Sequence, residues 1–305
     1  MGTCHAPASM AALDHACSRF PSPFRGTTTI RSTLGLTCPR YSQRVSGARV
    51  LLVVPTLGTR PELLRENLAS IRAQSVNADV VLVAPSDSSV ARQTADDFSI
   101  GLIPDSGSLP GAINIGVACA SVGHEYVNWL GDDDLLEPGS LEATVHALDS
   151  HPEAVVAYGS CRYIDDAGRE LWVSSAGKWA PRILTWGPDL IPQPGMLVRA
   201  SAWRDVGGLD ESYRFAFDLD LLLRLQRVGD LLAVPQVVSA FRWHGDSLTV
   251  GDRTTNLDES DRARLAALSP GVRRWSWIWR RPVRGATRLA AWEVSRRAQK
   301  ARNRR

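Results

Sequence analysis

The chain of 305 residues is long enough for one large or two small domains, and its hydrophobic share of 44% is ordinary for a soluble globular protein. No apolar run approaches the roughly 18–20 residues that a membrane-spanning helix needs, which argues against an integral membrane protein. Five cysteines without a CxxC pair indicate neither a zinc site nor a disulfide framework, so we expect a reducing compartment.

Charge is distributed unevenly along the chain, although the formal net charge is only +3. Residues 270–305 hold twelve arginines and lysines against one glutamate, and residues 1–49 hold six arginines against one aspartate. The remainder, residues 50–269, is acidic. An acidic body with basic ends indicates a metal-and-anion site in the body and an anionic surface as a partner of the ends.

Residues 1–47 are rich in Ser, Thr, Pro, Ala and Arg and show no sustained periodicity. They lack the apolar core of a secretory signal, and their acid-poor composition fits an organelle transit peptide only loosely. We expect a disordered extension, or a start codon assigned too far upstream, and we place the fold in residues 48–250.

Residues 48–150 alternate between strand and helix patterns. Val50–Val54 is a continuous run of valines and leucines, which is typical of a buried parallel strand. The further elements are a helix from Pro61, strands at 80–84 and 100–103, a glycine-rich loop at 106–111 before a helix, and a strand at 126–130. This spacing predicts βαβ units and a parallel sheet with right-handed crossovers.

Three consecutive carboxylates, Asp132, Asp133 and Asp134, end the strand at 126–130, and Pro138 then opens a helix. Ligands of α/β sheets bind at the carboxyl ends of strands. Because adjacent carboxylates repel one another, the site needs water, protons or a cation in compensation. Mg²⁺ binds such oxygen ligands, often together with substrate phosphates. The alternative is a solvated acidic turn in which Asp134 lies near the helix N-terminus.

Residues 151–250 have a mixed pattern. The predicted elements are strands at 154–158, 161–164, 170–173, 196–199, 231–234 and 237–243, a short helix closed by Gly207-Gly208, and a stronger helix at 217–228. We expect this half to pack on the ligand edge of the sheet. Its tryptophans, Trp172, Trp179 and Trp186, suit an acceptor groove, and core filling is the alternative.

The C-terminal tail, residues 251–305, interleaves Trp275, Trp277, Trp279 and Trp292 with arginines. This composition is typical of a segment that lies in the interface of an anionic membrane. Nucleic acid would attract the same charges, and a solvated tail would need no partner. We favour the membrane and expect no nucleic-acid partner.

Two common nucleotide motifs are missing. No G-x-G-x-x-G follows the first strand and no G-x-x-x-x-G-K-[ST] occurs, which argues against a Rossmann dehydrogenase and a P-loop phosphotransferase. The remaining motifs form one ordered set: Pro55-Thr56, Asp87, Gly111–Gly116, Trp129–Leu135 with Pro138-Gly139, Gln193–Arg199, Gly207–Asp210 and Phe217–Leu221. From about residue 48 to 250 this order closely resembles the family-2 glycosyltransferases of GT-A fold. The resemblance implies an inverting transfer of a sugar from a nucleotide donor to an acceptor hydroxyl.

The resemblance assigns donor-binding roles to residues of this chain. Pro55 and Thr56 would line the nucleotide, and Asp87 would meet its base or ribose. Asp132 would bind the ribose and diphosphate, and Asn114 would contact the donor. The residues themselves leave alternatives open, since Asp87 suits an Asx-turn and Asn114 suits a hydrogen bond on a helix face.

The metal and the general base follow from the same resemblance. Asp133, Asp134 and His244 would hold a divalent cation, Mg²⁺ or Mn²⁺, although His244 would equally suit a hydrogen-bonded imidazole at a strand end. Asp218 would be the catalytic base. Two departures matter, because Gly131 stands where many members have the first Asp of D-x-D, and Phe217 replaces the acid of the common Glu-Asp pair.

Helical geometry supports the assignment of Asp218. This carboxylate aligns with the leucines of its helix on the buried side, where a charge is costly unless it is paired or used. A structural helix cap is the alternative. Asp220 and Arg224 fall on the other, polar face and are expected to form a surface ion pair.

We therefore predict an α/β GT-A fold, a Rossmann-like and mostly parallel sheet flanked by helices. Its nucleotide-sugar half would be 48–150, its acceptor half 151–250, and its basic termini would be flexible. We expect a metal-assisted glycosyltransferase, cytoplasmic and peripheral at the inner membrane face, that acts on a glycan or lipid-linked acceptor. A non-catalytic sugar-nucleotide-binding or scaffold protein of the same fold is the alternative.

Overall fold

The computed structural model describes residues 47–105, 107–118, 123–174, 177–243, 253–278, 282–289, 292 and 296. All of these residues lie within one compact unit of the chain. The expectations for residues 1–46 and for His244 fall outside the described residues. In the part of the chain that the structure describes, no helix has the length and apolar content to cross a bilayer.

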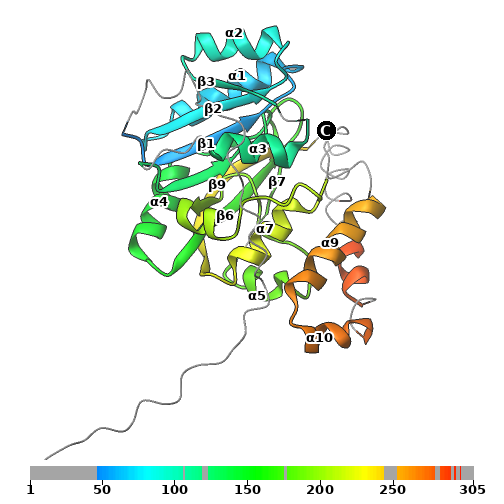
Figure 1. Ribbon diagram of the computed structural model, residues 1–305. Coiled ribbons are helices and arrows are strands. Elements are labelled where there is room, and N and C mark those ends of the chain that lie inside the picture. The colour runs from blue at the N-terminus through cyan, green and yellow to red at the C-terminus, as the bar shows by residue number, and fades with distance from the viewer. Residues whose placement is uncertain are drawn as a thin grey trace, which may run out of the picture. The chain divides into compact units, whose positions relative to one another are not determined.

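The first half of the fold is a parallel sheet with helical crossovers (Figure 1). Its elements are β1 (Val50–Pro55), α1 (Pro61–Arg72), β2 (Ala78–Ala84), α2 (Ser89–Asp97), β3 (Gly101–Pro104), α3 (Leu109–Ala118) and β4 (Tyr126–Trp129). The strands lie in the order β3-β2-β1-β4, and all three pairings are parallel. The predicted βαβ arrangement of this half is confirmed.

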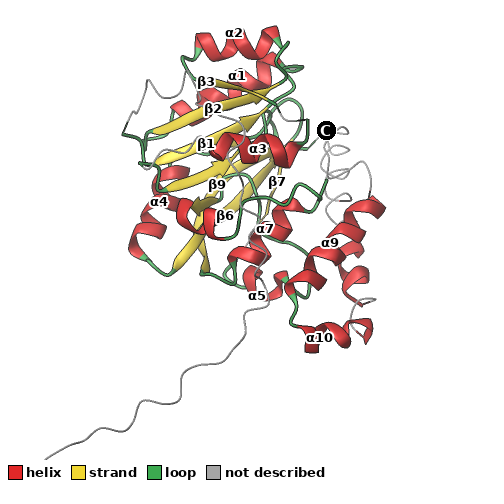
Figure 2. Cartoon of the chain, in the orientation of Figure 1, coloured by secondary structure: helices red, strands yellow, loops and turns green. Residues whose placement is uncertain are grey.

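The second half extends the same sheet with mixed strand directions (Figure 2). Its elements are β5 (Leu135–Leu136), α4 (Ser140–Ser150), β6 (Ala154–Ile164), β7 (Glu170–Ser174), α5 (Ala180–Leu184), β8 (Leu197–Arg199), α6 (Ala200–Asp205), α7 (Phe217–Leu225), β9 (Asp230–Arg242), α9 (Arg253–Ala267) and α10 (Pro270–Arg274). β8 runs antiparallel to both β4 and β6, whereas β9 runs parallel to β6. The predicted mixed character is confirmed.

The core lies on both faces of the sheet, and β1 shows why. Its residues alternate sides: Leu51 and Val53 contact the cluster that includes α3, α6 and α7, while Val50, Leu52 and Val54 contact the cluster that includes α1 and α4. All five side chains are fully buried, which explains their continuous apolar pattern. On one face α3 lies so near to β1 that a Cβ on Gly116 would be 2.4 Å from Val53 Cγ1.

Two pairs of predicted strands are single strands in the structure. The patterns at 154–158 and 161–164 form one strand, β6, and those at 231–234 and 237–243 form one strand, β9. The register between them shifts around Gly159, where a Cβ would lie 2.6 Å from the carbonyl oxygen of Gln236. Glycine lets the two strands bulge here while each continues as one strand. The apolar pattern of the sequence is interrupted at the same place, which is why two shorter strands were predicted in each case.

Candidate functional site

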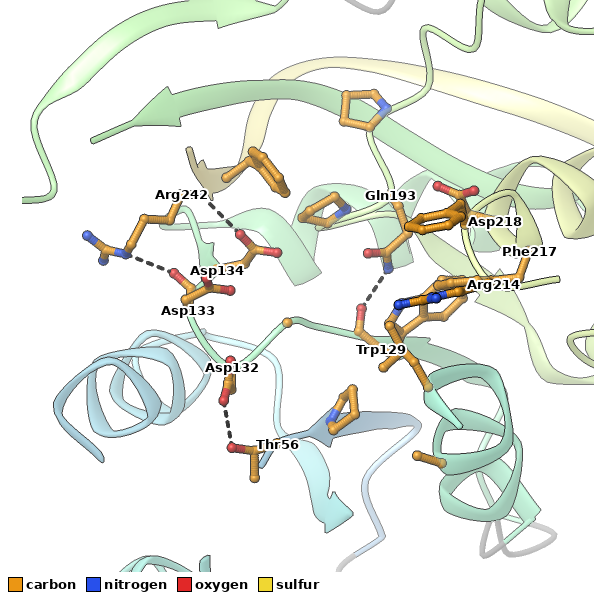
Figure 3. A pocket seen from close by; sticks show the side chains of 18 of the residues that line it. Thr56, Trp129, Asp132, Asp133, Asp134, Gln193, Arg214, Phe217, Asp218 and Arg242 are labelled. Atoms are coloured by element: carbon orange, nitrogen blue, oxygen red, sulfur yellow. Dashed lines mark hydrogen bonds between the residues drawn. The ribbon is translucent and has the colours of Figure 1, made fainter. Parts of the chain in front are cut away.

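A cavity of about 700 Å³ opens beyond the carboxyl ends of β1 and β4. It brings together six of the predicted site residues, namely Pro55, Thr56, Asp132, Asp133, Asp134 and Asp218. The three consecutive aspartates lie on one side of it and Asp218 lies on the opposite side, at the start of α7 (Figure 3). Residues separated by more than 80 positions in the sequence therefore face one space.

Asp132 and Asp133 are held by side chains from the loop after β1. The Thr56 hydroxyl donates to Asp132 Oδ2 at 2.6 Å, and Arg60 donates to Asp132 Oδ1 at 3.0 Å and to Asp133 Oδ2 at 2.8 Å. Burial raises the pKa of Asp132 above its ordinary value, despite these donors. Burial alone would lower the pKa of Arg60, but its two carboxylate partners outweigh that effect and raise it. Arg60 thus stays charged beside the acidic turn.

The backbone of the acidic turn is fixed by Asn67 and Arg242. The Asn67 amide donates to the carbonyl oxygens of Gly131 and Asp134, both at 2.8 Å. The Arg242 backbone N–H donates to Asp134 Oδ1 at 3.1 Å, and its guanidinium reaches the Asp133 carbonyl at 3.1 Å. Burial, followed by repulsion from Asp133, raises the pKa of Asp134 well above its usual range. The acidic turn is therefore rigid and incompletely neutralised.

Gly131 leaves space between two of these carboxylates. A Cβ at this position would lie 2.8 Å from Asp134 Oδ2 and 3.3 Å from Asp133 Oδ1. Among the described residues, no three His, Cys, Asp or Glu side chains converge as a complete metal site. Two carboxylates do fit the binding mode in which Mg²⁺ takes one or two protein carboxylates and completes its shell with water and substrate phosphates.

Asp218 lies at the second residue of α7, partly buried, with Oδ1 accepting from the Leu219 backbone N–H at 2.7 Å. Burial raises the pKa of Asp218 to about 6. Asp189 lines the same cavity, and burial together with repulsion from Asp218 raises its pKa to about 7. A carboxylate with a pKa near neutrality is suited to exchange a proton with a ligand.

Aromatic rings form the wall between the two sides. The Trp129 ring lies 6.1 Å from Phe217 and 6.0 Å from Trp203, measured between centroids. Gln193 donates to the Trp129 carbonyl at 2.8 Å and so ties the 193–195 segment to the end of β4 (Figure 3). Phe217, which stands where relatives were expected to carry an acid, thus packs against the end of β4 and leaves Asp218 to present the carboxylate.

Two predicted donor contacts do not line the cavity. Asp87 lies exposed in the turn between β2 and α2. Asn114 bonds with the Leu209 backbone twice, donating to its carbonyl at 2.9 Å and accepting from its N–H at 2.9 Å. The helix-face alternative for Asn114 thus has direct structural support, since its amide joins α3 to the segment after α6.

Replacing Asn114 with alanine is expected to lower the free energy of unfolding by about 1–3 kcal/mol, because the peptide group of Leu209 would lose both partners. The KM for the donor should stay within twofold of the wild-type value. Urea unfolding combined with steady-state kinetics would measure both quantities. A large rise in donor KM at unchanged stability would instead make Asn114 a ligand contact.

The sequence interpretation missed several side chains of the cavity. Arg60, Asp189 and Arg214 line it, and each lies in a segment without a periodic pattern. Arg242 was covered only as part of the predicted strand at 237–243. It is 2% exposed and donates to Glu66 and to the carbonyls of Asp165 and Asp166. The signal was the charge balance, since an acidic turn at a buried strand end requires nearby cations.

The ion pair predicted on α7 forms, but its predicted location at the surface is wrong. Asp220 and Arg224 do pair, at 2.6 Å, but the Asp220 residue is only 6% exposed. Arg224 also donates to the carbonyls of Val206 and Gly208, both at 2.7 Å. The face that the helical pattern marks as polar is buried against the segment after α6, where a charge pair satisfies its carbonyls.

Sequence comparison finds the profile of Glycosyl transferase family 2 in residues 51–200. An uncharacterized protein of Sinorhizobium fredii is 31% identical over 61% of this chain and 21% of its own length. The O-antigen biosynthesis protein RfbC of Myxococcus xanthus is 28% identical over 74% of this chain and 18% of its own length. The chain thus spans about a fifth of these two relatives.

Solved structures match the fold over a larger share of their own length. TarS of S. aureus, residues 1–349 in complex with UDP-GlcNAc, gives a TM-score of 0.56 at 15% identity and covers 74% of this chain and 69% of its own. The mannosyltransferase PcManGT of Pyrobaculum calidifontis, in complex with GDP-Man and Mn²⁺, gives 0.55 at 16% identity and covers 87% and 79%. At this identity the match shows the fold, which is the predicted GT-A arrangement.

Proposed function

We propose, from the premise that residues 51–200 form a domain of glycosyl transferase family 2, that the protein transfers a sugar from a nucleoside-diphosphate donor to an acceptor hydroxyl. One observation carries the proposal: the acidic turn Asp132–Asp134 and the carboxylate of Asp218 face a single cavity. That cavity, at about 700 Å³, is in the size range of small-molecule sites.

In this proposal the donor lies across the ends of β1 and β4. Pro55 and Thr56 line its nucleotide, and Asp132 contacts the ribose and diphosphate. Arg60, which already bridges Asp132 and Asp133, adds a positive charge next to the phosphates. Asp87 remains a candidate for contacting the nucleobase of the donor, because it follows β2 at the same edge of the sheet.

Asp218 acts as the general base. Its carboxylate takes the proton of the acceptor hydroxyl while that oxygen forms a bond to the anomeric carbon, and the bond from that carbon to the diphosphate breaks. Attack from the side opposite the leaving group inverts the anomeric configuration. The placement of Asp218 across the cavity from the acidic turn supports this in-line arrangement.

Asp133 and Asp134 would hold Mg²⁺ or Mn²⁺, and His244 is a further candidate ligand outside the described residues. A bound divalent cation would supply neutralisation of the diphosphate leaving group. The space at Gly131 and the raised pKa of Asp134 support a cation here. The protein's own part is to hold both carboxylates in place through Asn67 and Arg242.

The rival function, a sugar-nucleotide-binding scaffold without activity, is separated from this one by a single assay. Purified protein is incubated with a panel of nucleoside-diphosphate sugars and Mn²⁺, and release of the nucleoside diphosphate is measured. Thermal shift first selects the donor, because a bound ligand raises the apparent stability by mass action. If a donor binds but the purified protein neither transfers nor hydrolyses its sugar, the scaffold function would be favoured.

We further propose that the acceptor is a glycan or lipid-linked precursor at the inner face of a membrane. RfbC is named for O-antigen biosynthesis. The glycosyltransferase AmsE of Erwinia amylovora, 28% identical over 36% of this chain and 44% of its own length, is named for amylovoran biosynthesis. The C-terminal segment 272–278 supports a membrane surface, because Trp275, Trp277 and Ile278 are 58%, 68% and 54% exposed beside Arg273 and Arg274.

Replacing Trp275, Trp277 and Ile278 together with serine in the full chain is expected to weaken sedimentation with anionic vesicles at low salt at least fivefold. Three exposed apolar side chains that would enter the interface are removed, while the arginines and α9 remain. The control is Val173→Ser, which removes an apolar side chain that is 42% exposed on β7. Wild-type binding should weaken as salt screens the arginines. A wild-type protein that ignores anionic vesicles at low salt would contradict the proposal.

A further inference from the structure

Helix α9 borders the candidate active site, although it lies outside the segment that matches the family profile. Asn256 and Ser260, one turn apart on this helix, line the cavity. The α9 residue Ala263 is 1% exposed and belongs to the same core cluster as Phe217 and the leucines of α7. The helix is therefore packed onto the part of the fold that carries Asp218.

The principal contact between α9 and the site is Glu259. Its Oε2 accepts hydrogen bonds from the backbone N–H groups of Arg214 at 3.1 Å, Phe215 at 2.7 Å and Ala216 at 3.0 Å, and its Oε1 accepts from Arg214 at 3.0 Å. Successive N–H groups that converge in this way form an anion-binding concavity. Burial acts to raise the pKa of Glu259, but these donors outweigh it and lower the pKa, so the carboxylate stays charged.

The position of this carboxylate explains how α7 can begin where it does. The N-cap residue of α7 is Ala216, which has no side chain that can accept a hydrogen bond. Glu259, from another helix, accepts instead from the N–H groups of the three residues that lead into α7, and its charge lies at the end where the helix dipole favours it. Asp218 is only two residues further on, in the first turn. Its direction into the cavity therefore depends on the backbone that Glu259 holds.

A second side chain of α9 contacts the two residues that precede 214–216 in the chain. Arg262 donates to the Ser212 carbonyl at 2.9 Å, and its guanidinium lies 3.8 Å from the centroid of the Tyr213 ring. Together, Glu259 and Arg262 fix residues 212–216 against α9. This segment also carries Arg214, whose side chain lies in the cavity near Phe217 (Figure 3).

We propose that Glu259 is a positioning residue of the active site. It holds residues 214–216 so that α7 starts at Phe217 and presents Asp218 to the acceptor hydroxyl. The inference rests on the proposed function of Asp218 as the general base. In this proposal helix α9 contributes to the geometry of the active site and is not merely the beginning of the C-terminal tail.

The test compares three variants at Glu259 with one matched control. Glu259→Ala should lower kcat at least tenfold while the donor KM stays within twofold, because the donor side of the cavity is untouched. Glu259→Gln should recover most of the loss, since its amide oxygen can still accept from the N–H groups. Glu259→Asp keeps the charge but is one methylene shorter, so it should lower kcat about fivefold. The control, Asp258→Ala, removes the neighbouring carboxylate of α9, which pairs with Arg284, and should leave kcat unchanged.

A purely structural role would not change the pH profile, so the profile is the second measurement. Loosening residues 214–216 admits water to Asp218, and the midpoint of the acidic limb of kcat should fall from near 6 toward the ordinary aspartate range in Glu259→Ala. If the alanine variant does not fold, Glu259→Asp carries both measurements. Wild-type kcat and an unshifted acidic limb in these variants would overturn the positioning role, provided that Asp218→Asn is inactive. An active Asp218→Asn would overturn the proposed function instead.

Discussion

Replacing Asp218 with asparagine is expected to lower kcat by roughly 10²-fold or more, the usual scale for loss of a general base. The amide has nearly the same size and its oxygen can still accept from the Leu219 N–H, so the first turn of α7 should keep its geometry. Donor affinity should stay within twofold, because the acidic turn lies on the other side of the cavity. Single-turnover kinetics with saturating donor would isolate the transfer step.

The stability of the same variant provides a control with a definite sign. Burial raises the pKa of Asp218 in the folded state to about 6, above its value in the unfolded chain. A raised carboxyl pKa contributes stability only at low pH, and this contribution is lost as the pH rises through the folded-state pKa. At pH 7 the ionised carboxylate therefore opposes folding. Asp218→Asn should unfold no earlier than wild type at pH 7, so lost activity cannot be ascribed to unfolding.

The pH dependence of the wild-type enzyme follows from the same group. A general base must be unprotonated, so kcat should fall as the pH drops below about 6. Asp189 lies in the same cavity and its charge repels that of Asp218, so the two carboxyls titrate as a pair. Because burial raises the pKa of Asp218, and Asp189 with a pKa of about 7 is still largely protonated when Asp218 ionises, Asp189→Asn should leave the acidic limb near pH 6. If Asp218→Asn transfers sugar at a near wild-type rate at any pH, Asp218 is not the general base.

The sequence was sufficient for the parallel half of the fold because both faces of these strands are buried. Val50–Val54 has only apolar residues, and the helix patterns on either side of it have the correct spacing. The same logic located the acidic turn at the end of β4 and Asp218 on the buried side of α7. These predictions depend only on residues that are near one another in the sequence, so distant contacts do not alter them.

The sequence was insufficient where a contact joins distant segments. Asp220 and Arg224 were expected at the surface because a helical pattern shows polarity but not which neighbour covers it. Glu259 lies in a helix whose residues are mostly polar, and its partners are three backbone N–H groups more than 40 positions away. Backbone groups carry no signal in the sequence. The arginines that balance the acidic turn, Arg60 and Arg242, were likewise invisible as partners before the fold brought them together.

Replacing Asp133 with asparagine is expected to weaken donor binding by roughly tenfold or more in the presence of Mn²⁺, because the cation that this carboxylate would hold also binds the phosphates of the donor. Asp134→Asn should weaken it less, because Oδ1 of Asp134 already accepts from the Arg242 N–H and the amide oxygen can keep that bond. Both affinities are measured by thermal shift against nucleoside-diphosphate concentration. In excess chelator, wild type and Asp133→Asn should bind equally weakly.

The direction of the Asp133 effect separates a metal from the alternative in which Arg60 alone neutralises the diphosphate. Arg60 pairs with Asp133 at 2.8 Å, and the Arg60 side chain is 38% exposed toward solvent. If arginine carried the phosphate charge, Asp133→Asn would remove a competing carboxylate and tighten donor binding with or without metal. If the cation carries it, the same substitution weakens binding, and only when metal is present. Equal donor affinity and turnover of the wild-type protein in excess chelator would exclude the metal role assigned to Asp133 and Asp134.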